Sequence, residues 1–227
     1  MIRNWNRYNR DVEYDLLVSP FGYDFYNMTP KQAGLYFKWF ISIIPERMEY
    51  FRNRCASDLN IPVITLDYSP DSLIPVWRWF LKTARMEKTP KENLEKMIEG
   101  AKIFGESFIN WEQFTIATQF IMKDIAMYIG QSYVLNYPQL RWYYYTKPKN
   151  EINAKQPVIA GFYFKDQFTE GDATVNPMSI VDGAASGFYD KTQKETDIYS
   201  AYMQWVKWIP KTNQGNQSGD GFHVPKT

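Results

Sequence analysis

The chain has 227 residues, of which 44% are hydrophobic and 22% charged, and its formal net charge is +1. These values are close to the averages of globular proteins, and the length is sufficient for one large hydrophobic core without metals or disulfides. A nearly neutral chain lacks the concentrated basic face that phosphate binding needs, so nucleic acid is not an expected partner. No apolar run has the length of a membrane span, and the first residues lack the apolar core of a signal peptide. Because Cys55 is the one cysteine, no intramolecular disulfide can form, and we expect a cytoplasmic protein.

Aromatic residues make up 18% of the chain, with 17 Tyr, 15 Phe and 8 Trp. Tyr and Trp combine a large apolar area with a polar tip, so they are suited to half-buried positions and interfaces. The composition indicates a core and surface rich in aromatic rings. A contact surface for a protein or a carbohydrate is the alternative interpretation.

The first third of the chain begins with a segment that has no sustained periodicity. Residues 1–28 are interpreted as an extended arm whose rings dock on the main body, with a short strand near Tyr14–Val18. Residues 29–32, Thr-Pro-Lys-Gln, form a capping box with proline at the first helical position. The helix that starts there should kink or break at Pro45 and continue to about Ser57. Residues 59–66 are expected to be an extended connector.

Three more helices are predicted in the middle of the chain. One opens at the sequence Ser-Pro-Asp of residues 69–71. Residues 89–92, Thr-Pro-Lys-Glu, repeat the capping signal, and that amphipathic helix should end near Gly105. From Trp111 to Leu135 apolar residues occur on nearly all sides, which predicts a helix buried in the centre of the fold.

Two strands should follow this helix, at 140–146 and 157–164, because both segments are rich in aromatic and β-branched residues. The pair Asn176-Pro177 opens another helix, and a last helix spans about 195–209. Residues 211–227 have little to bury and are expected to be a disordered tail. We therefore predict an α+β fold, mainly helical, with a small antiparallel sheet of about two to four strands packed against a buried central helix. Residues 29–210 would form a single domain.

The chain offers few of the residues that common catalytic or metal sites use. The one histidine, His223, lies in the predicted tail, and no phosphate-binding glycine motif is present. We therefore expect no cofactor and no metal. A carboxylate pair could support glycoside hydrolysis, but the spacing of the acidic residues selects no pair. The carboxylates considered are Glu46, Glu49, Asp67, Asp71, Glu106, Glu112 and Asp124.

Candidate partner-binding residues lie at three places where the predicted elements end or bend. A broken helix exposes backbone groups, the turn before the second helix is acidic, and the aromatic strand has rings on both faces. The candidates are Glu46, Arg47, Asp67, Tyr68, Asp71, Tyr143 and Tyr145.

Several short motifs together resemble a family of uncharacterised bacterial proteins, mostly from Gram-positive species. The motifs are Trp39-Phe40-x4-Pro45-Glu46-Arg47, Leu66-Asp67-Tyr68-Ser69-Pro70-Asp71-Ser72-Leu73, Tyr128-Ile129-Gly130, Arg141-Trp142, Gln156-Pro157-Val158-x2-Gly161-Phe162 and Asn176-Pro177. A helix that ends in Tyr-x-Gly and is followed by a strand with Trp also resembles modules of small cytoplasmic proteins associated with toxin–immunity systems. The resemblance therefore implies an α+β fold and a protein-binding role. It carries no catalytic residue. Many such modules have Glu after the glycine, where this chain has Gln131, so no acidic function is transferred to that position.

The leading hypothesis is a non-enzymatic cytoplasmic protein that binds another protein, such as a toxin that it neutralises. One alternative is a structural or regulatory protein without a small-molecule ligand. The other is a carboxylate-based hydrolase that acts on glycans, with Trp and Tyr as sugar platforms.

Overall fold

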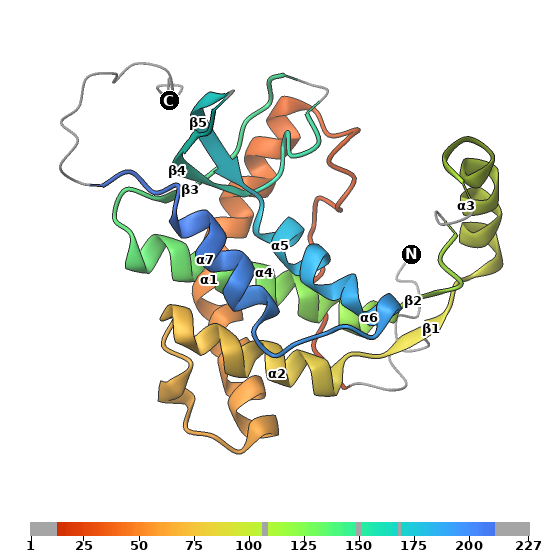
Figure 1. The fold of residues 1–227 in the computed structure, drawn as a ribbon, viewed down its shortest axis with the longest axis horizontal. Coiled ribbons are helices and arrows are strands. Elements are labelled where there is room, and N and C mark those ends of the chain that lie inside the picture. The colour runs from red at the N-terminus through yellow and green to blue at the C-terminus, as the bar shows by residue number, and fades with distance from the viewer. Residues whose placement is uncertain (1–12, 106–108, 149–150, 168, 212–227) are drawn as a thin grey trace.

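The computed structural model describes residues 13–105, 109–148, 151–167 and 169–211. Helices dominate this part of the chain, and its strands form one two-stranded and one three-stranded antiparallel sheet, which confirms the predicted fold class (Figure 1). In chain order the elements are α1 (Pro30–Leu59), the 3₁₀ turns η2 (Val63–Thr65) and η3 (Pro70–Ser72), α2 (Leu73–Thr83), β1 (Met86–Lys88), α3 (Lys91–Phe104), β2 (Glu112–Phe114), α4 (Ile116–Asn136), β3 (Arg141–Tyr143), β4 (Val158–Lys165), β5 (Glu170–Val175), α5 (Pro177–Ala185), α6 (Gly187–Asp190) and α7 (Asp197–Val206).

Helix α4 lies at the centre of the fold, as its all-round apolar sequence predicts. It packs against α1, α2 and α5 and against strands β3 and β4. The helix begins later than expected, because residues 112–114 pair with β1 as strand β2. Thr115 then caps α4, and its side-chain oxygen accepts a hydrogen bond from the backbone amide of Thr118.

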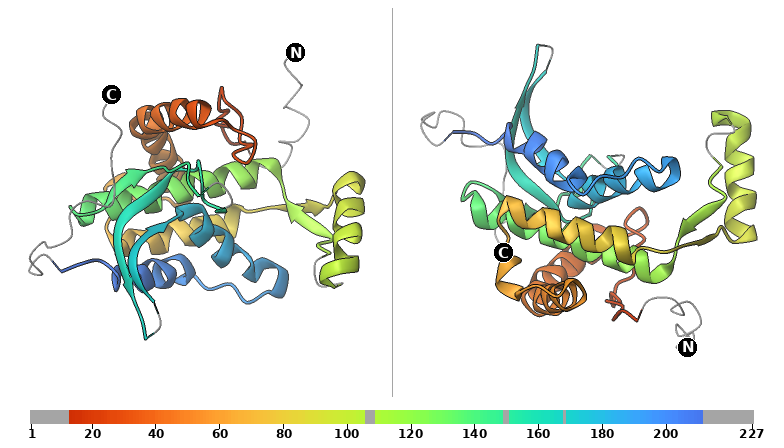
Figure 2. Two further views of the ribbon diagram at one scale, coloured as in Figure 1. Left: turned by 90° about the horizontal axis from the view of Figure 1, so that it is seen from above. Right: turned by 60° about the horizontal axis from the view of Figure 1, so that its bottom comes forward.

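Helix α1 starts with the predicted capping box, in which Thr29 and Gln32 exchange hydrogen bonds. Pro45 lies inside one continuous helix, and Figure 2 shows that the helix changes direction about halfway along. The predicted kink is therefore present without a break. The helix ends at Leu59, and the left-handed backbone conformation of the next residue, Asn60, stops it. The prediction of an extended connector at residues 59–66 is wrong in part, because residues 63–65 form the 3₁₀ turn η2.

The three-stranded sheet has the order β3–β4–β5, with Trp142 opposite Ile159 and Ile159 opposite Val175. The first two strands match the predicted segments, although β3 is shorter. Strand β5 was not predicted because its sequence, Glu-Gly-Asp-Ala-Thr-Val, lacks a clear apolar alternation. The β4–β5 register shifts at Gly161, which has a φ of +111° and leaves no room for a side chain beside the Gln139 carbonyl.

Trp142 joins this sheet to the central helix. Its six-membered ring lies directly on Gly130 of α4, so that a methyl group at Gly130 would overlap the ring. The ring of Phe40 on α1 meets Trp142 edge-on at a centroid distance of 5.0 Å. The Trp142 indole N–H donates to Gln131 Oε1 over 2.9 Å. The sheet, α1 and α4 therefore meet at one indole ring.

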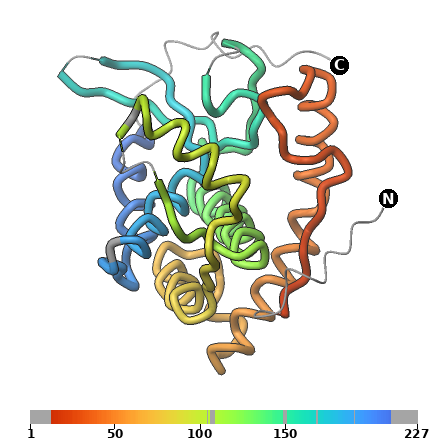
Figure 3. Tube along the Cα trace, turned by 90° about the vertical axis from the view of Figure 1, so that its right-hand side faces the viewer, coloured from red at the N-terminus to blue at the C-terminus, as the bar shows by residue number. Residues whose placement is uncertain are grey.

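The described part of the arm, residues 13–28, contains turns and extended backbone, so the strand expected at 14–18 is wrong. Its backbone has side-chain partners in place of a neighbouring strand; the Asp15 amide donates to the Tyr50 hydroxyl over 2.8 Å. Figure 3 shows the arm running along α1. The ring of Tyr14 is part of the core, and Leu17 and Tyr23 pack against it. Residues 1–12 and the predicted disordered tail beyond 211 lie outside the described residues.

Helix α3 is held away from the helical body on the ribbon formed by β1 and β2 (Figures 1 and 2). It begins and ends close to the predicted positions. The expected side-chain cap is not formed, because the Thr89 hydroxyl donates to the Asn110 carbonyl over 2.7 Å and Pro90 occupies the capping position.

The C-terminal helices cover the other side of α4. Asn176 caps α5 as predicted, and its side-chain oxygen accepts from the Met178 amide over 3.0 Å. Helix α7 is shorter than expected because the chain turns after it, and the Trp208 carbonyl accepts a hydrogen bond from Tyr163 of β4. Among the helices of the described ranges, none has the length and apolar character that crossing a membrane requires.

Candidate functional sites

A buried ion pair connects α1 with α4. The Arg47 guanidinium donates to the Asp124 carboxylate through Nε, at 2.9 Å from Oδ1 and 3.0 Å from Oδ2, and through Nη2, at 2.7 Å from Oδ2. The two side chains are 4% and 1% exposed. Burial opposes the charge of Arg47, but the hydrogen bonds and the charge of Asp124 outweigh it and raise the pKa of the guanidinium.

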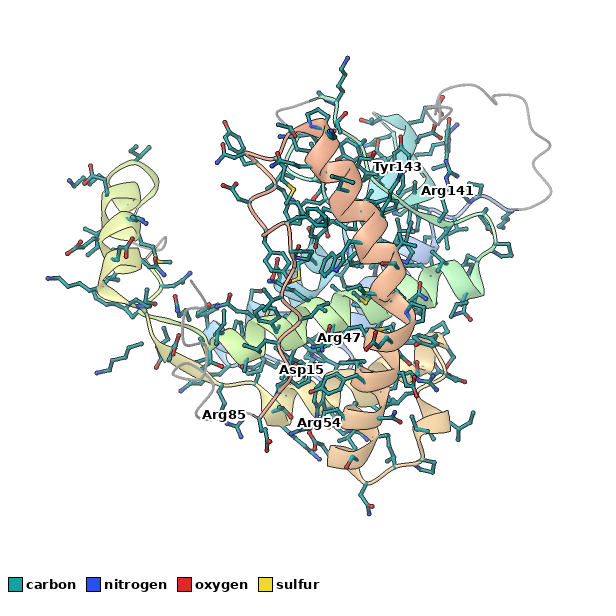
Figure 4. All side chains as sticks on the ribbon, turned by 180° about the vertical axis from the view of Figure 1, so that it is seen from behind. Asp15, Arg47, Arg54, Arg85, Arg141 and Tyr143 are labelled. Atoms are coloured by element: carbon teal, nitrogen blue, oxygen red, sulfur yellow. The ribbon has the colours of Figure 1, made fainter. Side chains whose placement is uncertain are left out.

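The N-terminal arm completes this ion-pair cluster. The Tyr14 hydroxyl donates to Asp124 Oδ2, and Asp15 accepts hydrogen bonds from Arg47 through its carbonyl and its carboxylate. The rings of Tyr14 and Tyr50 lie 5.3 and 4.6 Å from the guanidinium carbon. Burial and the adjacent carboxylate raise the pKa of Tyr14 well above its usual value. Figure 4 labels Arg47 and Asp15 where the arm meets α1.

Next to the ion pair is an aromatic cavity of about 150 Å³. Its walls come from the arm, the first half of α1, the middle of α4, β3 and the start of α5, and they are mostly apolar. The residues that line it are Leu17, Tyr23, Phe25, Tyr36, Trp39, Phe40, Phe120, Lys123, Asp124, Ala126, Met127, Trp142, Gln156, Pro157, Asn176, Pro177 and Met178.

Lys123 is the cation in the wall of this cavity. Its Nζ lies 3.5 Å from the centroid of the Tyr23 ring and 4.3 Å from that of Phe120. Burial lowers the pKa of its ammonium group to about 8, against the attraction of Asp124. The Tyr23 hydroxyl donates to the Leu17 carbonyl over 2.6 Å, so its hydrogen already has an acceptor within the arm.

The two partner-binding candidates after Pro45, Glu46 and Arg47, have different environments. Glu46 is exposed on α1, whereas Arg47 is buried in the ion pair with Asp124. Arg47 therefore stabilises the contact between α1 and α4, and it is not available to a partner surface.

The turn before α2 holds three further candidates, and two of them face solvent. Asp67 and Asp71 are exposed, and the Ser69 amide donates to the Asp67 carboxylate over 2.9 Å. Tyr68 is half-buried, stacks on the Tyr128 ring at 4.7 Å, and donates its backbone amide to the Tyr128 hydroxyl over 3.0 Å. The two carboxylates remain accessible, while Tyr68 fixes the turn to α4.

The candidates of the aromatic strand are both half-buried. Tyr143 has the guanidinium of Arg141 over its ring at 5.9 Å, and Figure 4 shows the two residues close together. Burial, together with the nearby carboxylate of Glu151, raises the pKa of Tyr145. Strand β3 and the acidic turn of residues 67–71, which precedes α2, lie at different parts of the molecule (Figure 1).

Lys123 is not among the candidates predicted from the sequence, and Asp124 is there only one of several carboxylates. A signal was present, since the adjacent charges Lys-Asp at 123–124 interrupt an otherwise apolar helix. A buried charge normally has a partner, and here Arg47 supplies it from 77 residues away.

The cavities give no support to the hydrolase hypothesis. Asp124 is the one carboxylate among the described residues that line the aromatic cavity, and it is committed to Arg47. Asp24 and Glu151 both line another hollow, but both are exposed. Hydrogen bonds from Asn27 hold the pKa of Asp24 below its usual range, and a general acid needs the opposite shift. In the described ranges no three His, Cys, Asp or Glu side chains lie together as metal ligands would.

Comparison with known proteins gives no relative from which a site could be transferred. No family model, no curated protein and no solved structure matches this chain.

Proposed function

We propose that this chain is a non-enzymatic protein-binding protein whose partner packs against helix α3. The observation that carries the proposal is the apolar stripe of α3, formed by Leu94, Met97, Ile98 and Ala101 at positions i, i+3, i+4 and i+7. These side chains are half-buried or exposed, and within the described residues they are not among those that pack on the core. An amphipathic helix on a ribbon away from the body needs another surface to cover its apolar face.

The flanks of α3 suit an interface of this kind. Three pairs of Lys and Glu form intrahelical ion pairs on its polar side, with N–O distances from 2.7 to 3.8 Å. Ile103 is 79% exposed on the face opposite the stripe, because it follows Leu94 by nine residues, and Trp111, just before β2, is 65% exposed. Amphipathic helices with such a stripe bind in hydrophobic grooves, and an exposed Trp side chain is a typical anchor of an interface.

The resemblance to toxin–immunity proteins supports a toxin as this partner, bound and neutralised in the cytoplasm. Cys55 is a buried free thiol, and the burial raises its pKa to about 12. A structural cysteine of that kind is compatible with a reducing compartment.

The test compares two exposed isoleucines on different elements, Ile64 in η2 and Ile98 on α3. Ile98 is 41% exposed on α3, and Ile64 is 73% exposed beside the acidic turn of residues 67–71. The product of each adjacent gene is co-expressed with the wild type, with Ile98→Asp or with Ile64→Asp, and growth and co-purification are measured. We expect Ile98→Asp to abolish binding and protection and Ile64→Asp to retain both, because only the first places a charge in the stripe.

Two results would contradict the proposal. If Ile64→Asp abolishes binding and Ile98→Asp does not, the partner binds the acidic turn and α3 is not the interface. If no adjacent product binds the wild-type chain or is neutralised by it, the toxin-binding role is wrong. Circular dichroism of both variants verifies that the fold is retained, which both exposed positions should permit.

A further inference from the structure

We propose that the aromatic cavity beside Arg47 and Asp124 binds a small aromatic carboxylate, with the carboxylate on the Lys123 ammonium and the ring among Trp39, Phe40 and Trp142. This inference concerns a site at the junction of the arm, α1, α4 and β3, and it does not depend on the proposed partner of α3.

The size and lining of the cavity indicate the apolar part of the ligand. A cavity of about 150 Å³ lined by apolar side chains can stay dry and accept a molecule as large as benzene. Trp39, Phe40 and Trp142 are all half-buried, so part of each ring surface is left uncovered by the protein. Aromatic rings prefer edge-on or offset contacts with another ring, and a monocyclic ligand supplies such contacts.

The charges around the cavity indicate the polar part of the ligand. Both oxygens of Asp124 accept hydrogen bonds from Arg47, and one also accepts from Tyr14, so this carboxylate already has its partners. Among the described residues Lys123 has aromatic rings as its close neighbours and makes neither a hydrogen bond nor a salt bridge. An anion is the group that complements a cation in such a setting.

The side-chain amides in the wall already have partners inside the protein. Asn176 Nδ2 donates to Asn153 Oδ1 and Gln156 Oε1, each over 3.0 Å, and Asn176 Oδ1 accepts from the Met178 amide. These amides shape the wall without providing a second ionic contact. A ligand with one anionic group and one ring therefore matches the cavity better than a polyhydroxylated sugar does.

The test uses benzoate and its neutral analogue benzamide as probes of the full chain, with isothermal titration calorimetry as the measurement. We expect benzoate to bind saturably with a dissociation constant below about 1 mM. Lys123→Met should weaken benzoate binding by about 10- to 100-fold, because it removes a charge-assisted hydrogen bond, and should leave benzamide binding unchanged. Lys38→Met, which changes an exposed lysine on α1, is the matched control and should bind benzoate as the wild type does.

A second measurement locates the ligand. The indole N–H signals of Trp39 and Trp142, assigned in NMR spectra with Trp→Phe variants, should shift on addition of benzoate to the wild type. The proposal is overturned if benzoate does not bind saturably, if Lys123→Met binds it as tightly as the wild type, or if the shifts lie at other tryptophans. It is also overturned if benzamide binds the wild type as tightly as benzoate, because the lysine would then select no anion.

Discussion

Replacing Asp124 by Asn keeps the shape of the side chain and removes the charge that Arg47 faces. The carboxylate accepts guanidinium hydrogen bonds of 2.7, 2.9 and 3.0 Å, and both side chains are nearly inaccessible to water. Removing one partner of such a buried pair costs about 3–5 kcal/mol, because the other charge is left without solvation. Asp15 and the rings of Tyr14 and Tyr50 still contact the guanidinium, so we expect the lower end of this range, about 3 kcal/mol.

The assay is urea denaturation followed by circular dichroism, applied to Asp124→Asn, Arg47→Met and the double variant. The double variant removes both charges, so it should cost about 2 kcal/mol less than the sum of the two single variants. Arg78→Met is the control, because the Arg78–Glu195 pair has a similar distance of 2.8 Å but is about half exposed, and it should cost less than about 1 kcal/mol. The reasoning is refuted if Asp124→Asn costs less than about 1 kcal/mol or if the single effects simply add.

Three further predictions concern α4. Gly130→Ala should destabilise the fold by about 2–3 kcal/mol, because the added methyl overlaps the Trp142 ring, and a thermal midpoint equal to that of the wild type would contradict this packing. Gln131→Glu should have a free energy of unfolding within about 0.5 kcal/mol of the wild type, because a glutamate oxygen can still accept the hydrogen bond from Trp142. Gln131→Leu removes the acceptor and should destabilise the fold by about 1 kcal/mol. Equal urea midpoints for the two variants would show that this hydrogen bond does not stabilise the fold. Burial lowers the pKa of Lys123 from 10.5 to about 8, so between these pH values the unfolded chain binds more protons at this position than the folded chain does. The contribution of Lys123 to the free energy of unfolding therefore rises with pH in this window. Lys123→Met should lose that contribution, and urea titrations across this window in which both proteins show the same pH dependence would refute the shift.

The helix starts could be predicted because their signals are local. Thr29 and Asn176 have their capping partners within three residues, so the sequence alone contains both halves of the interaction. Thr89 has the same local signal, but the predicted cap is wrong, because its hydroxyl donates to a carbonyl 21 residues away. Strands β1 and β2 were not predicted, because they too depend on a partner that is distant in the sequence. Each has three residues, and pairing with the other strand defines them more than periodicity does.

The candidate sites were harder to predict because distant segments build them. Arg47 was expected at a partner surface because a helix broken at Pro45 would expose backbone groups, and nothing near it in the sequence identifies Asp124 as its partner. The cavity needs the arm, α1, α4 and β3 to meet, so the unusual environment of Lys123 exists only in the folded chain. The aromatic surplus did indicate many half-buried rings, although not that several of them surround one cation.

The attachment of the arm to α4 has a consequence for the order in which the molecule folds. Tyr14 and Asp124 are 110 residues apart, so their hydrogen bond closes a very long loop and needs α1 and α4 to be in place first. We therefore expect the arm to dock late and to detach by local opening while α4 stays folded. Native-state hydrogen exchange would then show residues 14–18 exchanging faster than α4. Because Leu17, Tyr23 and Phe25 form one wall of the aromatic cavity, each such opening would remove that wall and release whatever the cavity holds.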